Sequence, residues 1–250
     1  MTDAAPTWSP REYAIAFHDT FDLAGEAYRR VCRSAFDAPG FCIIDLGPES
    51  SSVAMRQAMV ALKRELQSIL HARSGRELLY LSAERFDQQQ TTKFHLDGAP
   101  QESILMLGYE PSDVASEVSL ADYSRCAHDL GLMPDDFLAA HNPMFPPGAK
   151  LLQPYVTKLD AFSNRSFQIV LINNSHAQYS ETNGGWQGVL HTATILNPNE
   201  SKRRVINSTM IGVFPAGTIE AISEQDQEAF KTTTLVRRKG YDKPHLRDDE

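Results

Sequence analysis

The sequence predicts a mainly β fold with flanking helices. Two observations support this: an N-terminal part with helical periodicity, and a middle part built of short apolar runs separated by Gly, Pro, Asn and polar clusters. Short runs of this kind are typical of an antiparallel sandwich or barrel. We expect one domain over 1–250, with a helical and strand region at 1–75, a β core at 76–222, and a helix and polar tail at 223–250.

The N-terminal region should contain two helices and one strand. A helical pattern runs from Phe21 to Phe36 and stops at Ala-Pro-Gly, before the apolar run Phe41-Cys-Ile-Ile-Asp. A serine of the run 50–52 can cap a second helix. Within it, apolar residues recur at alternating steps of four and three, a stripe that we expect to face the core: Met55, Met59, Leu62, Leu66 and Ile69.

The β core should contain six strands of alternating or continuous apolar character. They are expected at Glu77 to Ser82, Lys93 to Asp97, Ser103 to Tyr109, Phe167 to Asn173, Gly188 to Ile195 and Val205 to Phe214. The segment 113–148 is predicted as an insertion with helices at Leu120 to Leu130 and Pro134 to His141. The polar tail from Arg237 is expected to fray.

Composition excludes several classes of function. The chain has 24 basic and 32 acidic residues, and its net charge of −8 is spread without the basic stripe that a nucleic-acid backbone requires. No apolar run approaches the roughly 20 residues of a membrane span, and the opening Met-Thr-Asp-Ala-Ala-Pro lacks the features of a signal peptide. Three scattered cysteines, Cys32, Cys42 and Cys126, indicate thiols in a reducing cytoplasm.

His95 and Asp97 are the first candidate site residues. They are separated by one residue in a segment that is expected to be a strand, so their side chains should project from the same face. An imidazole beside a carboxylate supplies two ligands of the two-histidine, one-carboxylate facial triad, which leaves open positions on a metal ion. A His-x-Asp pair alone is common, and a surface histidine near a loop carboxylate is the simpler interpretation if no other residue matches.

The third ligand must come from a distant strand. His191 lies in the apolar run Gly188-Val-Leu-His-Thr-Ala-Thr-Ile and fits this requirement. A lone buried histidine is more often a hydrogen-bonded core residue, so His191 gains its meaning from the upstream pair. His176, in Asn-Asn-Ser-His, is the competing candidate.

Arg204 and Ser208 form the fourth element of the pattern. Arg204 follows His191 by thirteen positions, and Ser208, four residues later on the same strand, should face the same way. A guanidinium binds a carboxylate through two parallel hydrogen bonds, and a nearby hydroxyl adds another. Of the adjacent pair Arg203 and Arg204, we expect only one to point inward and the other to be an ordinary solvated charge.

In this order, the residues resemble the iron(II)- and 2-oxoglutarate-dependent dioxygenases, whose pattern is His-x-Asp, a long gap, His, and then Arg. The Arg-x-x-x-Ser spacing of Arg204 and Ser208 is similar to the phytanoyl-CoA hydroxylase branch. The run Gly40-Phe-Cys-Ile-Ile is similar to the isopenicillin N synthase-like branch, but Ile206 stands where that branch has the serine of Arg-x-Ser. The resemblance covers 91–214 well and the rest loosely.

The resemblance implies a double-stranded β-helix, or jelly roll, as the core. It implies Fe(II) held by His95, Asp97 and His191, and 2-oxoglutarate held at its distal carboxylate by Arg204 and Ser208. It also implies O2 as oxidant and hydroxylation of a small organic substrate as the usual outcome, with no acid or base among the side chains. Related halogenases replace the carboxylate ligand by a small residue, so Asp97 argues against halogenation.

Two other classes of function remain as alternatives. A zinc hydrolase can use the same three ligands with a bound water, but it has no need of a carboxylate-binding Arg204. The chain could also be a non-catalytic jelly-roll binding protein, in which the pattern of potential metal ligands would have arisen by chance. Four polar or aromatic residues are weaker candidates for reaching a substrate, each more often a surface or packing residue: Arg85, Lys93, Arg125 and Trp186.

Overall fold

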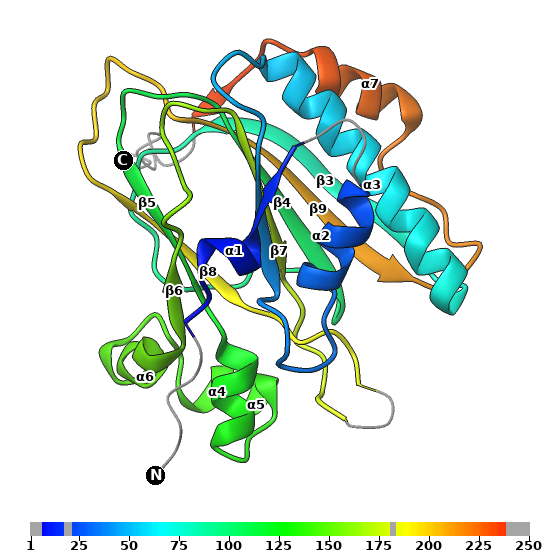
Figure 1. Ribbon diagram of the computed structural model, residues 1–250, viewed down its shortest axis with the longest axis vertical. Coiled ribbons are helices and arrows are strands. Elements are labelled where there is room, and N and C mark those ends of the chain that lie inside the picture. The colour runs from blue at the N-terminus through cyan, green and yellow to red at the C-terminus, as the bar shows by residue number, and fades with distance from the viewer. Residues whose placement is uncertain (1–6, 18–21, 181–183, 239–250) are drawn as a thin grey trace, which may run out of the picture.

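The computed structural model describes residues 7–17, 22–180 and 184–238. The expected helix start at Phe21, the opening six residues and the tail beyond Arg238 lie outside the described residues. Two β-sheets form the centre of the molecule, and helices pack against one face and one end (Figure 1). The expectation of β-sheets with flanking helices is therefore confirmed.

The described residues form a first sheet of seven strands and a second of three. The first sheet has the order β1 (Ala14–Ala16), β2 (Phe41–Asp45), β7 (Gln168–Asn173), β4 (Ser103–Tyr109), β9 (Val205–Phe214), β3 (Glu77–Asp87) and β10 (Arg237–Arg238). The second has the order β6 (Val156–Lys158), β5 (Ser116–Ala121) and β8 (Leu190–Ile195). β1 with β2 and β10 with β3 are parallel, and the other pairs are antiparallel.

The antiparallel pairs of the core are nested along the chain. β3 pairs with β9, the segment at His95 bridges to β8, β4 pairs with β7, and β5 pairs with β6. The chain therefore folds back on itself as one long hairpin whose pairs alternate between the two sheets. This nesting brings segments that are far apart in sequence into register across the core.

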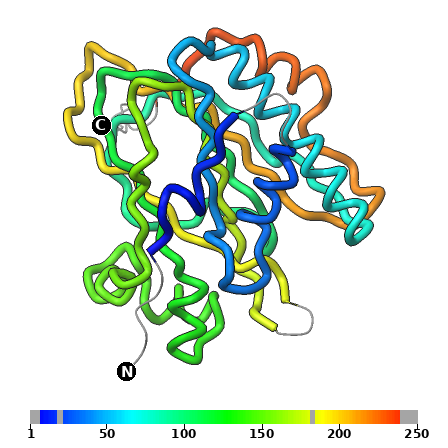
Figure 2. The backbone as a smooth tube through the Cα atoms, in the orientation of Figure 1, coloured from blue at the N-terminus to red at the C-terminus, as the bar shows by residue number. Residues whose placement is uncertain are grey.

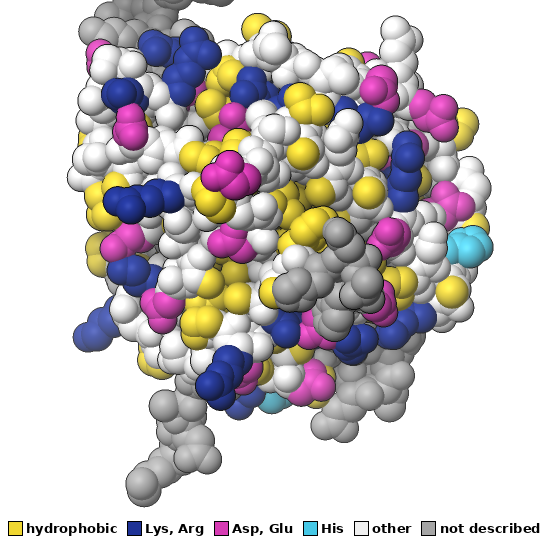
Figure 3. Space-filling view, turned by 45° about the horizontal axis from the view of Figure 1, so that its top comes forward, with side chains coloured by type: hydrophobic (Ala, Val, Ile, Leu, Met, Phe, Trp, Pro, Cys, Tyr) yellow, Lys and Arg dark blue, Asp and Glu magenta, His cyan; other side chains and the backbone are white. Residues whose placement is uncertain are grey.

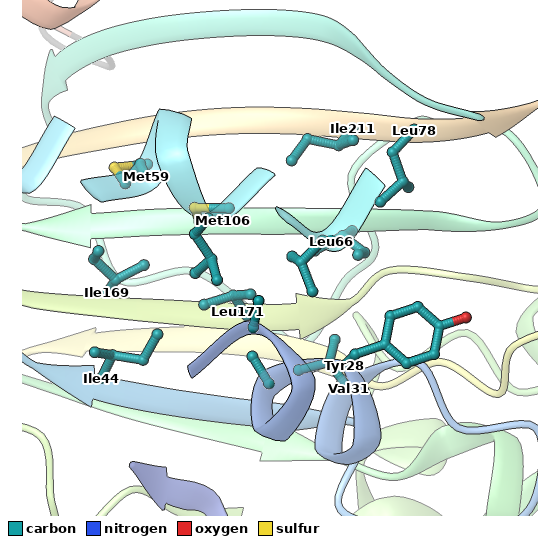
Figure 4. Packing of buried hydrophobic residues seen from close by; sticks show 14 of the residues in the cluster. Tyr28, Val31, Ile44, Met59, Leu66, Leu78, Met106, Ile169, Leu171 and Ile211 are labelled. Atoms are coloured by element: carbon teal, nitrogen blue, oxygen red, sulfur yellow. The ribbon is translucent and has the colours of Figure 1, made fainter. Parts of the chain in front are cut away.

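Helices α2 (Leu23–Val31), α3 (Ser52–Ser74) and α7 (Glu224–Thr232) cover the outer face of the first sheet. Ser51 caps α3 by accepting a hydrogen bond from the Ala54 amide at 3.0 Å, and Gly75 ends the helix in the left-handed conformation at φ 66°. The predicted stripe on α3 is confirmed as core-facing. Figure 4 shows Met59 and Leu66 of α3 in one apolar cluster with Met106, Leu171 and Ile211 of the sheet.

Strand alternation divides the apolar residues of the first sheet between two cores. On β7, Ile169 and Leu171 face the helices, whereas Val170 and Ile172 face the second sheet. On β9, Ile206 and Met210 also face the second sheet, while Ile211 faces the helices. The space between the sheets is thus lined by the even-numbered side chains of β9, a set that includes Ser208.

Three further helices lie at one end of the second sheet (Figure 2). They are α4 (Tyr123–Asp129), α5 (Pro134–Ala140) and α6 (Pro146–Leu152), followed by the short 3-10 helix Gln153–Tyr155. A further short helix, α1 (Pro10–Tyr13), leads into β1. Helices α4, α5 and α6 and the ends of β5 and β8 enclose a third apolar cluster that contains Tyr123, Phe137 and Leu190.

Several predicted boundaries were wrong. The range Leu120 to Leu130 is not one helix, because β5 continues to Ala121 and Asp122 then caps α4 through the Arg125 amide. The segment 113–148, predicted as an insertion, includes β5 at the centre of the second sheet. Arg237 and Arg238 pair with β3, whereas we expected the tail to fray from Arg237. β3 also runs five residues past Ser82, and the helix expected to reach Phe36 ends at Val31.

The surface carries charges of both signs. On the face shown in Figure 3, basic and acidic side chains are interspersed with apolar ones. The three cysteines are unpaired, and Cys42 and Cys126 are buried. In the part of the chain that the structure describes, no helix combines the length and the apolar character needed to cross a bilayer.

We expect Leu66→Ala to lower the free energy of unfolding by about 2–5 kcal/mol, because the side chain is 1% exposed and its removal leaves a cavity under α3. Val53→Ala on the same helix, where the side chain is exposed, should change it by about 0.5 kcal/mol or less. Urea unfolding of both variants measures the difference. Equal effects would mean that α3 does not form the core contact described above.

Candidate metal centre

The segment that carries His95 and Asp97 lies between β3 and β4. The prediction of a strand at Lys93 to Asp97 was wrong. The segment instead makes an isolated bridge, in which His95 and His191 exchange backbone hydrogen bonds of 3.2 and 3.1 Å. Phe94 and Leu96 pack against the cluster of helices α4 to α6. The side chains of His95 and Asp97 alternate with these two and line one cavity. The prediction that they share a face is therefore confirmed, although the segment is not a strand.

His95, Asp97 and His191 come together as the sequence predicted. One ligand atom from each lies within 4.8 Å of the others. The two imidazole centroids are 4.2 Å apart, and His95 Nε2 lies 3.5 Å from Asp97 Oδ1. Ligand atoms bound to one metal ion at about 2.0–2.2 Å are separated by roughly 3 Å, so small side-chain shifts bring all three onto one ion.

A backbone carbonyl orients the His95 side chain, and an amide side chain holds the backbone at Asp97. His95 Nδ1 donates to the Lys93 carbonyl at 2.7 Å, which leaves the lone pair of the neutral ring on Nε2, toward Asp97. Asn174, which is 1% exposed, accepts the Asp97 amide at 3.0 Å and donates to its carbonyl at 2.9 Å. Sequence reasoning missed Asn174, and the only signal was the polar Asn-Asn-Ser that follows the apolar β7.

The surroundings shift the pKa values of the two histidines in opposite directions. Burial, together with the neighbouring His95, lowers the pKa of His191 to about 4, so its ring is neutral at pH 7. The hydrogen bond with Asp97 raises the pKa of His95 above its ordinary value, against the opposing effect of burial. His191 Nδ1 is buried and makes no hydrogen bond within the described residues. Neutral imidazole is the form that binds a metal ion.

A cavity of about 130 Å³ opens beside the three residues. Its apolar walls include Phe86, Leu107 and Ile206, and its polar groups include Tyr109 and Ser208. A cavity of roughly 150 Å³ can hold a small organic molecule. Ser208 thus faces the same space as the candidate ligands, as the sequence predicted.

Arg204 is almost completely buried, at 2% exposure. Its Nε donates to Ser116 Oγ at 2.9 Å, its Nη1 donates to the Gln88 carbonyl at 3.2 Å, and its guanidinium carbon lies 5.2 Å from the centroid of the Tyr109 ring. Its Nη2 is buried without a hydrogen-bond partner, and no carboxylate of the described residues forms an ion pair with the group. Burial lowers the pKa of Arg204, but the guanidinium remains charged.

Arg203, the alternative to Arg204, is exposed to solvent. It lines a separate polar hollow with Ser112 and Arg165, outside the space between the sheets. The structure therefore places Arg204, and not Arg203, on the inner side of β9.

The competing candidate residues lie elsewhere. His176 Nδ1 contacts Asp135 Oδ1 of α5 at 2.9 Å, and His176 does not belong to the His95, Asp97 and His191 group. Arg85 pairs with Glu110, and Arg125 pairs with Asp129. Trp186 is buried in the helix-facing core, and Lys93 donates to the Met144 carbonyl at 2.8 Å.

Comparisons with known proteins assign no family to this geometry. The chain matches no protein-family model and no curated protein.

Replacing His95, Asp97 or His191 by Ala should lower the affinity for a divalent metal ion by at least roughly a hundred-fold, because even the loss of a group that only orients a metal ligand costs 10–100-fold. His176→Ala should bind the ion like the unmutated protein, since its ring contacts Asp135 instead. Anaerobic titration calorimetry measures these affinities. Retained binding in His191→Ala with lost binding in His176→Ala would reverse the ligand assignment.

Proposed function

We propose that this protein is a non-haem iron oxygenase that couples the oxidative decarboxylation of 2-oxoglutarate, to succinate and CO2, with oxidation of a small organic substrate, most often hydroxylation. The observation that carries the proposal is the buried Arg204. It forms no ion pair among the described residues and its Nη2 is buried without a hydrogen-bond acceptor there, so that only Tyr109 and the more distant Asp87 offset its charge. Burying a charge without an ion-pair partner costs free energy, and an anion bound beside it would offset that cost. That anion would lie beside a His-Asp-His group, where a metal ion can bind.

The donor set fits ferrous iron. Two imidazoles and one carboxylate occupy three positions and leave the others open, which is the arrangement of non-haem iron oxygenases. When bound there, iron supplies the activation of O2, and 2-oxoglutarate supplies the electrons. His95 and His191 contribute neutral nitrogen ligands, and Asp97 contributes the negative charge that offsets part of the charge of the metal.

The distal carboxylate of 2-oxoglutarate would bind at the far end of the cavity. Arg204 Nη2 would offer the free donors from behind Tyr109, which lines the cavity and whose ring centroid lies 5.2 Å from the guanidinium carbon. The Ser208 hydroxyl lines the same cavity as Tyr109. Hydrogen bonds between a guanidinium and a carboxylate are among the stronger ones in proteins. The apolar walls around these groups exclude water and so strengthen the charge interaction.

The nested strand pairs support the jelly roll as the fold. In such a fold, eight strands form two facing sheets, each built from alternate pairs of one long hairpin. Here β3, the segment at His95, and β4 to β9 would be the eight strands, with the second strand reduced to the His95 bridge. The gap between the sheets would then hold the metal and the cosubstrate.

The substrate would approach from the side of Asp97. The side chains of His95 and Asp97 are 30% and 44% exposed, whereas His191 is only 8% exposed. A small molecule fits this narrow opening better than a protein or a nucleic acid. The packing of Phe94 and Leu96 against helices α4 to α6 would fix the rim that such a substrate meets.

A zinc hydrolase would use the same three ligands, but Arg204 would have no role in its mechanism. A hydrolytic site needs a bound water and a charge stabiliser next to the metal, not a buried guanidinium at the other end of a cavity. The energetic cost of burying Arg204 therefore favours the oxygenase.

Arg204→Lys should weaken the binding of 2-oxoglutarate by roughly ten- to a hundred-fold, because a single ammonium cannot keep the Ser116 and Gln88 contacts and also bind the carboxylate, and charge-assisted hydrogen bonds contribute about 1.5–3 kcal/mol. Iron affinity should be nearly unchanged. Anaerobic titration of 2-oxoglutarate into the Fe(II)-loaded protein, followed by the metal-to-ligand charge-transfer band, measures the effect.

Arg203→Lys is the matched control, since that side chain is exposed and should tolerate the change. A loss of binding in the Arg203 variant alone would reverse the assignment. No charge-transfer band in the unmutated protein would remove 2-oxoglutarate from the mechanism.

A further inference from the structure

Ser116, near the start of β5, holds one side of the Arg204 guanidinium. The Ser116 hydroxyl accepts the Arg204 Nε hydrogen at 2.9 Å, and both residues are buried, at 4% and 2% exposure. Ser116 also donates to Asn164 Oδ1 at 3.3 Å. Three polar side chains therefore form a directed chain from Arg204 through Ser116 to Asn164.

The direction of this chain follows from the hydroxyl, which has one hydrogen to donate. Because that hydrogen points to Asn164, the oxygen lone pairs face the Arg204 Nε–H. Asn164 is itself held through its backbone, since its carbonyl accepts the Ser112 amide at 2.8 Å. The acceptor for Nε is thus oriented before any ligand binds.

This contact joins the two sheets. Ser116 is on the inner side of β5 together with Val118 and Leu120, which pack between the sheets. Arg204 precedes β9 of the other sheet, and its amide donates to Asp87 Oδ1 at 2.9 Å. The first sheet therefore holds the backbone of Arg204, and the second sheet holds the Nε of its guanidinium.

We propose that Ser116 is a positioning residue for the distal carboxylate of the cosubstrate, an inference that rests on the proposed function. Nε is occupied by Ser116 and one side of Nη1 by the Gln88 carbonyl, so Nη2 is the nitrogen left without a partner, and a carboxylate would bind at that end. The side-on approach, through Nε and one terminal nitrogen, is blocked. Ser116 would in this way select the orientation of the dicarboxylate along the cavity.

The test compares three variants of β5 in Fe(II)-loaded protein. Ser116→Ala removes the acceptor, Ser116→Thr keeps a hydroxyl, and Ser119→Ala changes a serine on the opposite side of the same strand. Each is titrated anaerobically with 2-oxoglutarate and with 2-oxobutyrate, which keeps the 2-oxo acid group but lacks the distal carboxylate. Iron affinity and thermal unfolding are measured for every variant.

Ser116→Ala should weaken the binding of 2-oxoglutarate by about three- to ten-fold, the effect of losing one hydrogen bond that fixes the guanidinium. Its binding of 2-oxobutyrate and of iron should not change, because neither depends on Arg204. Ser116→Thr should restore binding of 2-oxoglutarate to within about two-fold, and Ser119→Ala should match the unmutated protein. In an Arg204→Lys background, Ser116→Ala should add no further loss, since the two changes act on one contact.

Two results would overturn the inference while leaving the proposed function intact. One is unchanged binding of 2-oxoglutarate in Ser116→Ala, and the other is an equal loss of affinity for both 2-oxo acids, which would mean general damage to the site. Failure of the unmutated protein to bind 2-oxoglutarate would instead overturn the proposed function, and the positioning role with it.

Discussion

The candidate site depends on one backbone contact, the reciprocal pair of hydrogen bonds between His95 and His191. These two residues are far apart in the chain, and each carries a candidate ligand. Because the amide and carbonyl of both residues are used in the bridge, the two imidazoles are held side by side at 4.2 Å before any metal binds. Asn174, which follows β7, holds the backbone of Asp97 through two further hydrogen bonds. A metal site built in this way needs little reorganisation when the ion enters.

Two buried groups between the sheets differ in their charge state: His191 is neutral and Arg204 is charged. His191 is buried where an imidazolium would be disfavoured, which keeps its ring neutral. Arg204 is buried as a charged group, and taking such a group out of water costs several kcal/mol unless partners replace the water. Ser116, the Gln88 carbonyl and the Tyr109 ring replace part of that water, and Nη2 is left without a hydrogen bond among the described residues. Under the proposed function, this energetic cost would favour binding of the anionic cosubstrate.

The rest of the fold holds these groups in place. Helices α2, α3 and α7 cover the outer face of the first sheet, so the alternating side chains of β9 are fixed with Ser208 inward. Helices α4 to α6 pack behind Phe94 and Leu96 and so support the ligand segment from the other side. Both supports are apolar packing, which resists displacement because protein interiors are close-packed.

The sequence by itself determined the local patterns of this protein. The stripe on α3, the apolar strands and the order His95, Asp97, His191 and Arg204 could all be predicted, because periodicity and residue chemistry are local properties of the chain. It could not give the nested pairing of strands, which made β5 part of the second sheet and reduced 93–97 to a bridge, since pairing is decided by long-range packing. Nor could it distinguish Arg203 from Arg204 or identify Ser116 and Asn174 as partners. Those choices depend on which face of each strand the tertiary structure buries, and a shift of one residue in register would have reversed them.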